Sequence, residues 1–274
     1  MKTLARLVLT ATALSLFAAA CAKVPVTGRR QFNVIPNGVM NKIGKTSYRQ
    51  TLSEKNIIKE GEDAELMRKV GKRIAVVADQ PDFDWSYALI RDKTLNAWCL
   101  PGGYIGVFTG ILPAMENEAG MAFVMGHEIG HAVAHHGSER LSQQIVVLGG
   151  VAGLVALADS QVDMDGKQKA IVFGALGIGA EVGILLPFSR AHESEADVIG
   201  MMFAAGAGYP PGEGITLWDR MSALSKGPEV PSWISTHPSN DDRQAHMKEW
   251  MPRAKKRFER NKLDYDTRRA LWVK

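Results

Sequence analysis

An α+β fold that is predominantly helical, with a small β-sheet lining an active-site cleft, is the architecture that the sequence predicts. Most of the chain after residue 45 shows helical spacing of apolar residues, and three short strand-like runs lie between residues 85 and 109. A His-Glu-x-x-His segment falls within the longest helical stretch. Apolar residues make up 46% of the 274 residues, which is enough for one substantial core. We expect the domain to span residues 46–250, with a charged helix or tail at 251–274.

The N-terminal residues 1–20 have the layout of a secretory signal peptide. Lys2 and Arg6 precede a short apolar run that ends in small residues. Cys21 follows at once, and this arrangement resembles the lipid-carrying cysteine of a bacterial lipoprotein. The expected location is therefore periplasmic, with a lipid anchor on Cys21 in the outer membrane, while plain secretion with a free Cys21 stays open. The other cysteine, Cys99, lies in an apolar segment and is interpreted as a buried small hydrophobic residue.

The net charge of +4 is too small to indicate a nucleic-acid partner, and no basic stripe interleaved with aromatic residues is present. Residues 21–45 are rich in Pro, Gly and Asn and are expected to be irregular. The next stretch, 46–80, has helical spacing and is ended by Pro81. Three short runs of strand character follow, at residues 85–90, 95–99 and 104–109.

One long helix is predicted over residues 113–140. Two apolar stretches follow at 145–158 and 171–188, and they favour buried core helices over a membrane hairpin. The first is too short to span a bilayer, and the second contains Glu181 and four glycines. Further helices are predicted at residues 192–205, 215–224 and from 241 onward.

The His-Glu-x-x-His segment carries the chemistry. His127 and His131 are four residues apart on a predicted helix, so both imidazoles can reach one ion. Glu128 points about 100° around the helix and can accept a proton from a metal-bound water as it attacks a peptide carbonyl. The same acid can protonate the leaving amine. These residues predict a zinc-dependent endopeptidase, although two histidines and a carboxylate would also hold other divalent metals.

A catalytic zinc needs a third protein ligand. His135 and His136 lie away from the face of the two spaced histidines, and we interpret them as polar residues at the helix end. Glu193 and Asp197 are four residues apart on a later helix, so that one can bind metal while the other orients an imidazole. Spacing alone does not choose between Glu193 and Glu195.

Together these segments resemble the HtpX-like and CAAX-prenyl-protease-like zinc metallopeptidase family, a gluzincin family, in its short periplasmic lipoprotein branch (LoiP type, related to the BepA type). The pieces occur in the order of the family and cover most of the mature chain. They are Pro25 to Gln31, Asn96-Ala97 with Leu100 to Ile105, His127 to His131, Glu193 to Asp197, and Ser235 to Pro238.

The resemblance implies roles for individual residues. It makes Glu193 the third zinc ligand and Asp197 its supporting neighbour. It places Asn96 and Ala97 in an edge strand beside the cleft, where an extended substrate could pair through backbone hydrogen bonds. It places His237 near the metal, either in the fourth coordination position or as a donor to the oxyanion.

We therefore expect hydrolysis of misfolded or unassembled envelope proteins, and the resemblance extends to the outer-membrane assembly machinery as a partner. We expect no counterpart of the helical-repeat domain of BepA-type members after His237. Three alternatives stay open: a metal-binding chaperone or assembly factor with His237 blocking the zinc, a structural zinc site, and an integral membrane protease with residues 145–188 inserted.

Overall fold

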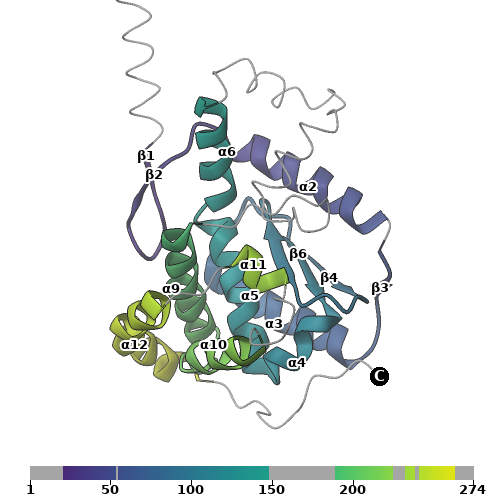
Figure 1. Cartoon of the computed structure of the whole chain (residues 1–274), viewed down its shortest axis with the longest axis vertical. Coiled ribbons are helices and arrows are strands. Elements are labelled where there is room, and N and C mark those ends of the chain that lie inside the picture. The colour runs from purple at the N-terminus through teal and green to yellow at the C-terminus, as the bar shows by residue number, and fades with distance from the viewer. Residues whose placement is uncertain (1–20, 54, 148–188, 225–231, 238–240, 263–274) are drawn as a thin grey trace, which may run out of the picture.

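The computed structural model describes residues 21–53, 55–147, 189–224, 232–237 and 241–262, and the elements lie as Figure 1 shows. A two-stranded hairpin precedes a four-stranded sheet with helices around it. The elements in chain order are β1 (Cys21–Lys23), β2 (Arg30–Phe32), α2 (Asn37–Ser53), β3 (Ile57–Ile58), α3 (Glu62–Ala78), β4 (Ser86–Ile90), β5 (Ala97–Leu100), β6 (Tyr104–Phe108), η1 (Thr109–Ile111), α4 (Leu112–Met115), α5 (Glu118–Val133), α6 (His136–Val147), α9 (Arg190–Gly206), α10 (Glu213–Leu224), α11 (Ser232–Thr236) and α12 (Asp241–Asn261).

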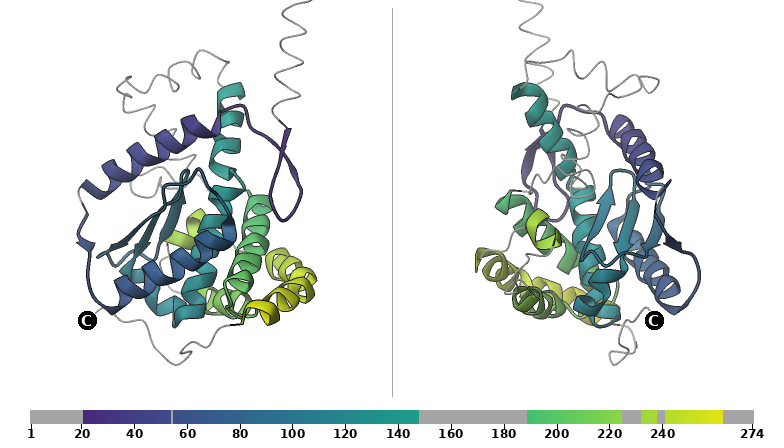
Figure 2. Two further views of the ribbon diagram at one scale, coloured as in Figure 1. Left: turned by 180° about the vertical axis from the view of Figure 1, so that it is seen from behind. Right: turned by 45° about the vertical axis from the view of Figure 1, so that its right-hand side comes forward.

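The four-stranded sheet is mixed and buried on both faces. Its strand order is β3-β4-β6-β5, with β4 and β6 parallel and the other pairs antiparallel. Alternate residues such as Leu89 and Ile105 belong to the core shared with α3 and α5, whereas Ile90 and Trp98 pack with residues of α2. Figure 2 shows α2 and α3 on opposite sides of the sheet. Burial of both faces explains why these strands are continuous apolar runs.

Helix α5 forms the centre of the domain and packs closely along α9. Every residue of α5 is buried. The two helices approach so closely at Gly126 and Gly200 that a Cβ on Gly200 would lie 2.6 Å from the backbone nitrogen of His127. Only glycine permits this approach, and it brings the first turns of α9 beside the His-Glu-x-x-His segment.

The predicted α+β class is confirmed, but the long helix predicted over 113–140 is wrong as a single element. It is divided into α4, α5 and α6. The Asn117 side chain accepts hydrogen bonds from the backbone N–H groups of Ala119 and Gly120, and so begins α5 afresh. At the other end His135 has a φ of 53°, which turns the chain between α5 and α6. Both breaks are local backbone features that apolar spacing does not report.

Two other expectations for the N-terminal part are corrected. The segment 21–45 is not irregular throughout, because it contains the β1–β2 hairpin and the start of α2. The helical stretch 46–80 is interrupted by β3 and by Gly61, which has a φ of 103° and directly precedes α3. Cys99 is buried and free, as predicted.

The predicted signal peptide at 1–20 lies outside the described residues, as does almost all of the apolar region 145–188. Among the residues that are described, no helix is long and apolar enough to cross a membrane. The boundary predicted between 250 and 251 falls inside α12, which continues to Asn261.

Replacing Gly200 by alanine tests the close approach of α5 and α9. We expect Gly200→Ala to destabilise the domain by about 1–3 kcal/mol, because the added methyl group must push α9 away from α5. Thermal or urea unfolding measures this change. Gly38→Ala is the matched control, since a Cβ at Gly38 meets no atom within 4 Å. Equal stability of both variants would contradict the interpretation.

Candidate metal centre

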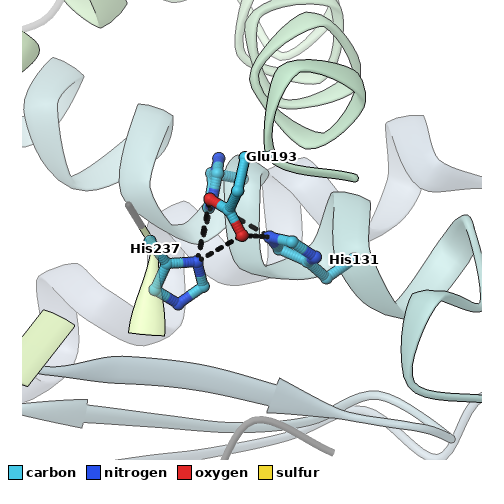
Figure 3. Close-up of side chains that lie close together, drawn as sticks. His131, Glu193 and His237 are labelled. Carbon is cyan, nitrogen blue, oxygen red and sulfur yellow. Dashed lines mark hydrogen bonds and ion pairs between the residues drawn. The ribbon is translucent and has the colours of Figure 1, made fainter. Parts of the chain in front are cut away.

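Four buried side chains from three separate segments converge on one point. His127 and His131 lie one turn apart on α5, Glu193 lies in the first turn of α9, and His237 directly follows α11. One ligand atom from each lies within 4.8 Å of the other three. Figure 3 shows the Glu193 carboxylate directed toward the rings of His131 and His237. The four residues are called the ligand cluster below.

The spacing of these atoms fits a tetrahedral ion. Four donors about 2.05 Å from a tetrahedral zinc lie about 3.3 Å from one another. The Nε2 atoms of His127 and His131 are 3.1 Å apart, and Nε2 of His131 lies 3.4 Å from Oε1 of Glu193. Nδ1 of His237 lies 3.3 Å from Nε2 of His127 and 3.2 Å from each Glu193 oxygen. The ligand cluster can therefore hold one zinc, with His237 in the fourth position.

A buried ion-pair network orients the His127 ring through its Nδ1 atom. Nδ1 of His127 lies 2.9 Å from Oδ1 of Asp197, one helical turn beyond Glu193. Arg243 donates to both Asp197 oxygens, at 2.6 and 2.8 Å, and lies 3.0 Å from Glu193. The indole of Trp218 also donates to Asp197, at 3.3 Å. Asp197 thus fixes the imidazole so that Nε2 faces the other ligands, and Arg243 offsets the charge of two buried carboxylates.

His131 is oriented by a different chain of contacts. Its Nδ1 lies 2.9 Å from Nδ1 of His136, whose Nε2 lies 3.0 Å from Oε2 of Glu195. Glu195 in turn accepts hydrogen bonds from Thr27 and from Nε of Arg29, the latter at 2.6 Å. The choice that spacing left open is thus resolved in geometry: Glu193 lies in the ligand cluster, and Glu195 lies one layer outside it.

The interpretation of His136 as a polar residue at the helix end is wrong. Its side chain is fully buried, and its ring stacks on that of His192 at 4.3 Å. The turn at His135 explains the error, because it removes His136 from the helical register of α5 and brings its ring against His131. The signal available in the sequence was that His136 is a further histidine close to the pair of His127 and His131.

Arg29 also binds a second acidic residue. Its guanidinium donates to both oxygens of Glu139, at 3.1 and 2.9 Å, and His192 lies 3.1 Å from the same carboxylate. Partial burial opposes ionisation of Glu139, but the hydrogen bonds from His192 and Arg29 lower its pKa to about 2. The segment between β1 and β2 is therefore tied to α6 and α9 by charged contacts.

The ionisation of the ligand cluster suits a cation. Burial holds the pKa of His131 well below its ordinary value, so this imidazole is neutral. Burial opposes ionisation of Glu193, but His237 and Arg243 outweigh it and hold the pKa of this carboxyl well below its usual range. Burial also acts to lower the pKa of His127, but the hydrogen bonds to Asp197 and Glu193 raise it to about 9. A metal at Nε2 of His127 would therefore compete with a proton.

Glu128 is buried beside the ligand cluster without belonging to it. Its Oε1 accepts a hydrogen bond of 2.8 Å from the indole N–H of Trp233 and lies 3.6 Å from Nε2 of His237. Burial raises the pKa of Glu128, while the nearby His237 and His127 act in the opposite direction. A carboxylate with a raised pKa is suited to taking up and giving back a proton.

Asn96 and Ala97 lie where the edge of the sheet meets the site. Strand β5, which begins at Ala97, lies at the edge of the sheet, and β6 is its partner among the described strands. The Asn96 side chain accepts the backbone N–H of Ala97 at 3.0 Å, and the carbonyl of Leu95 accepts the backbone N–H of Trp233, also at 3.0 Å. Farther along the strand, Cys99 and His131 line one small pocket.

Comparisons with known proteins agree with this site. Residues 61–251 match the model of peptidase family M48. The chain is 34% identical over 248 residues to mitochondrial metalloendopeptidase OMA1 of Schizosaccharomyces pombe, a match that covers 89% of this chain and 70% of that protein. It is 33% identical over 176 residues to the OMA1 protein of Arabidopsis thaliana, with 64% of this chain and 33% of that protein covered.

A bacterial relative is also similar. The beta-barrel assembly-enhancing protease of Yersinia pestis is 26% identical over 191 residues, which cover 65% of this chain and 37% of that protein. The predicted resemblance is thus confirmed at the level of the family, whereas similarity to the lipoprotein branch stays a prediction. Because the family match extends over more than half of the sequence and encloses the whole ligand cluster, the chain belongs to peptidase family M48, and it is a metalloendopeptidase.

Proposed function

We propose that this metalloendopeptidase uses zinc to hydrolyse peptide bonds of misfolded or unassembled envelope proteins. The observation that carries the zinc chemistry is the ligand cluster with Glu128 buried beside it. His127, His131 and Glu193 are the proposed protein ligands, and Asp197 orients His127. This set corresponds to a catalytic site of three protein ligands, with a fourth position that substrate or water can take when His237 withdraws.

The protein residues divide the reaction between them. Bound zinc would supply a Lewis acid that polarises the peptide carbonyl and acidifies water. Glu128 accepts the proton of the attacking water and delivers it to the leaving amine, so that one carboxylate serves both proton transfers. His237, which lies 3.6 Å from Glu128, is placed to donate to the oxyanion after it withdraws from the fourth position.

Strand β5 supports a preference for extended, unfolded chains. A substrate strand can pair with a sheet edge through backbone hydrogen bonds, which demand little of its sequence. The edge at Ala97 is covered by the Asn96 side chain, which a substrate carbonyl would replace. We therefore assign Asn96 and Ala97 to substrate binding, and folded proteins, whose backbone groups are already paired, would be poor substrates.

Cleavage of casein tests the peptidase mechanism. We expect Glu128→Gln to lower the rate by about 10²–10⁴-fold, because an amide cannot accept and return the proton. Zinc content should equal that of the wild type, since Glu128 is outside the ligand cluster. Glu65→Gln, an exposed residue of α3, is the matched control. A zinc-loaded Glu128→Gln protein that cleaves casein at the wild-type rate would rule out Glu128 as the base.

A second candidate function is a chaperone or assembly factor whose zinc is blocked by His237. It is favoured by the position of His237 in the fourth tetrahedral place, within 3.3 Å of His127 and Glu193. A site of this kind would bind unfolded chains without cutting them at rest. The OMA1 relatives are named as metalloendopeptidases, which favours the enzyme as the first proposal.

Alanine at His237 separates resting closure from a direct catalytic role. If His237 closes the site, His237→Ala should cleave casein faster than the wild type, because a larger fraction of molecules has an open position. The measurement is the initial rate at equal zinc content. A slower variant would instead assign His237 to the oxyanion, and the closed-site explanation would be wrong.

We also propose that the protein is a periplasmic lipoprotein anchored to the outer membrane through Cys21. The support is the sequence pattern of residues 1–21. In bacteria fed a clickable fatty acid, we expect the wild type to carry the label and to sediment with outer membranes. Cys21→Ser should lose both properties, and Cys99→Ala should keep both. An unlabelled wild type would favour plain secretion.

A further inference from the structure

Trp233 makes polar contacts with three parts of the site at once. Its side chain is fully buried, and its indole N–H donates to Oε1 of Glu128 at 2.8 Å. Its backbone N–H donates to the carbonyl of Leu95 at 3.0 Å, and its own carbonyl accepts the backbone N–H of His237 at 2.8 Å. One residue of α11 thus joins Glu128, the segment that leads into β5, and the ligand cluster.

Ring packing fixes the direction of the indole N–H. The ring of Trp233 stacks on Trp218, with centroids 5.1 Å apart and planes at 25°, and the Arg243 guanidinium lies over the Trp218 ring at 3.9 Å. His127 meets Trp233 edge-on at 5.6 Å, and His237 is tilted against it at 5.0 Å. A ring held between these neighbours cannot turn to follow a moving carboxylate.

The contact divides the two oxygens of Glu128 between different tasks. Oε1 has Trp233 as its hydrogen-bond donor, and within the described residues Oε2 has none. A buried carboxylate without a donor is strongly disfavoured, and one beside a metal could take the fourth position as a ligand. The fixed donor at Oε1 stabilises the buried carboxylate and also opposes its movement into the fourth coordination position. It leaves Oε2 free to receive a proton from the attacking water.

We propose that Trp233 is a positioning residue for peptide hydrolysis, whose indole N–H holds Glu128 by Oε1 and leaves Oε2 to accept the proton of the attacking water. The inference rests on the proposed function, because it acts through Glu128 as the base. The backbone contact with Leu95 extends the role: since β5 continues from this segment, Trp233 also keeps Glu128 in a constant position relative to a substrate paired with β5.

Zinc-loaded Trp233→Phe, which keeps an aromatic ring and removes the N–H, is the main test. With labelled casein as substrate, we expect kcat to fall about 10- to 100-fold, as for loss of a hydrogen bond to a charged group, with little change in KM or zinc content. In the Glu128→Gln background the same substitution should cause no further fall, because residues that act as a unit are not additive. Trp250→Phe, on α12, controls for loss of a partly buried indole.

A second measurement does not depend on activity. The indole ¹H–¹⁵N resonance of Trp233, assigned by its loss in Trp233→Phe, should move upfield in Glu128→Gln when its acceptor loses charge. Should Trp233→Phe fail to fold, benzothienylalanine at position 233 alone keeps the ring shape and removes the donor.

Four results would overturn the inference while leaving the proposed function intact. The first is a kcat of Trp233→Phe within twofold of the wild type, and the second is a raised kcat, which would mean that Trp233 holds the site closed. The third is an equal fall in kcat in the wild-type and Glu128→Gln backgrounds. The fourth is an indole resonance of Trp233 that does not move in Glu128→Gln. A wild-type enzyme that does not cleave casein would instead overturn the proposed function itself.

Discussion

The contact between α5 and α9 at Gly126 and Gly200 is the constraint on which the site depends. Zinc ligation tolerates errors of only a few tenths of an ångström, and the ligand cluster draws on α5, on α9 and on the residue after α11. Two helices in backbone contact have little freedom to slide, so Glu193 is held at a fixed height against His127 and His131. The positions of the ligand atoms are thus fixed by contacts within a small region, and the sheet packs against the helices that carry them.

Burial of charged side chains in this region also costs folding free energy. Asp197 and Glu193 are fully buried carboxylates, and Arg243 is the cation that contacts both. Removing one partner of such a set leaves an uncompensated charge, which is far more destabilising than losing an exposed ion pair. The last described helix, α12, is therefore part of the site although none of its residues belongs to the ligand cluster. The two carboxylate partners of Arg243 lie about fifty residues earlier in the chain, so spacing in the sequence gives no indication of this role.

Periodicity and spacing predicted what is local. The three strand-like runs follow from short apolar segments bounded by turn residues. The pairing of His127 with His131 and the facing of Glu193 with Asp197 follow from a spacing of four residues. What escaped prediction depends on single backbone torsions or on long-range packing. His136 enters the site through one positive φ at His135, and Trp233 arrives from a short helix without an apolar repeat. The choice of Glu193 over Glu195 came from family resemblance, and its physical reason is which side of α9 faces α5.

The hairpin that carries Arg29 would act as a short tether if Cys21 carries the lipid that we propose. Arg29 binds Glu195, which contacts His136 and through it His131, so the beginning of the described chain is held against the site. Arg29 is eight positions after Cys21 in the sequence, and even a fully extended chain over eight steps reaches only about 28 Å. With a lipid on Cys21, the scissile bond would be cut in a thin layer next to the bilayer. Substrates would then be chosen by where they emerge, and a chain that had diffused into the bulk compartment would escape.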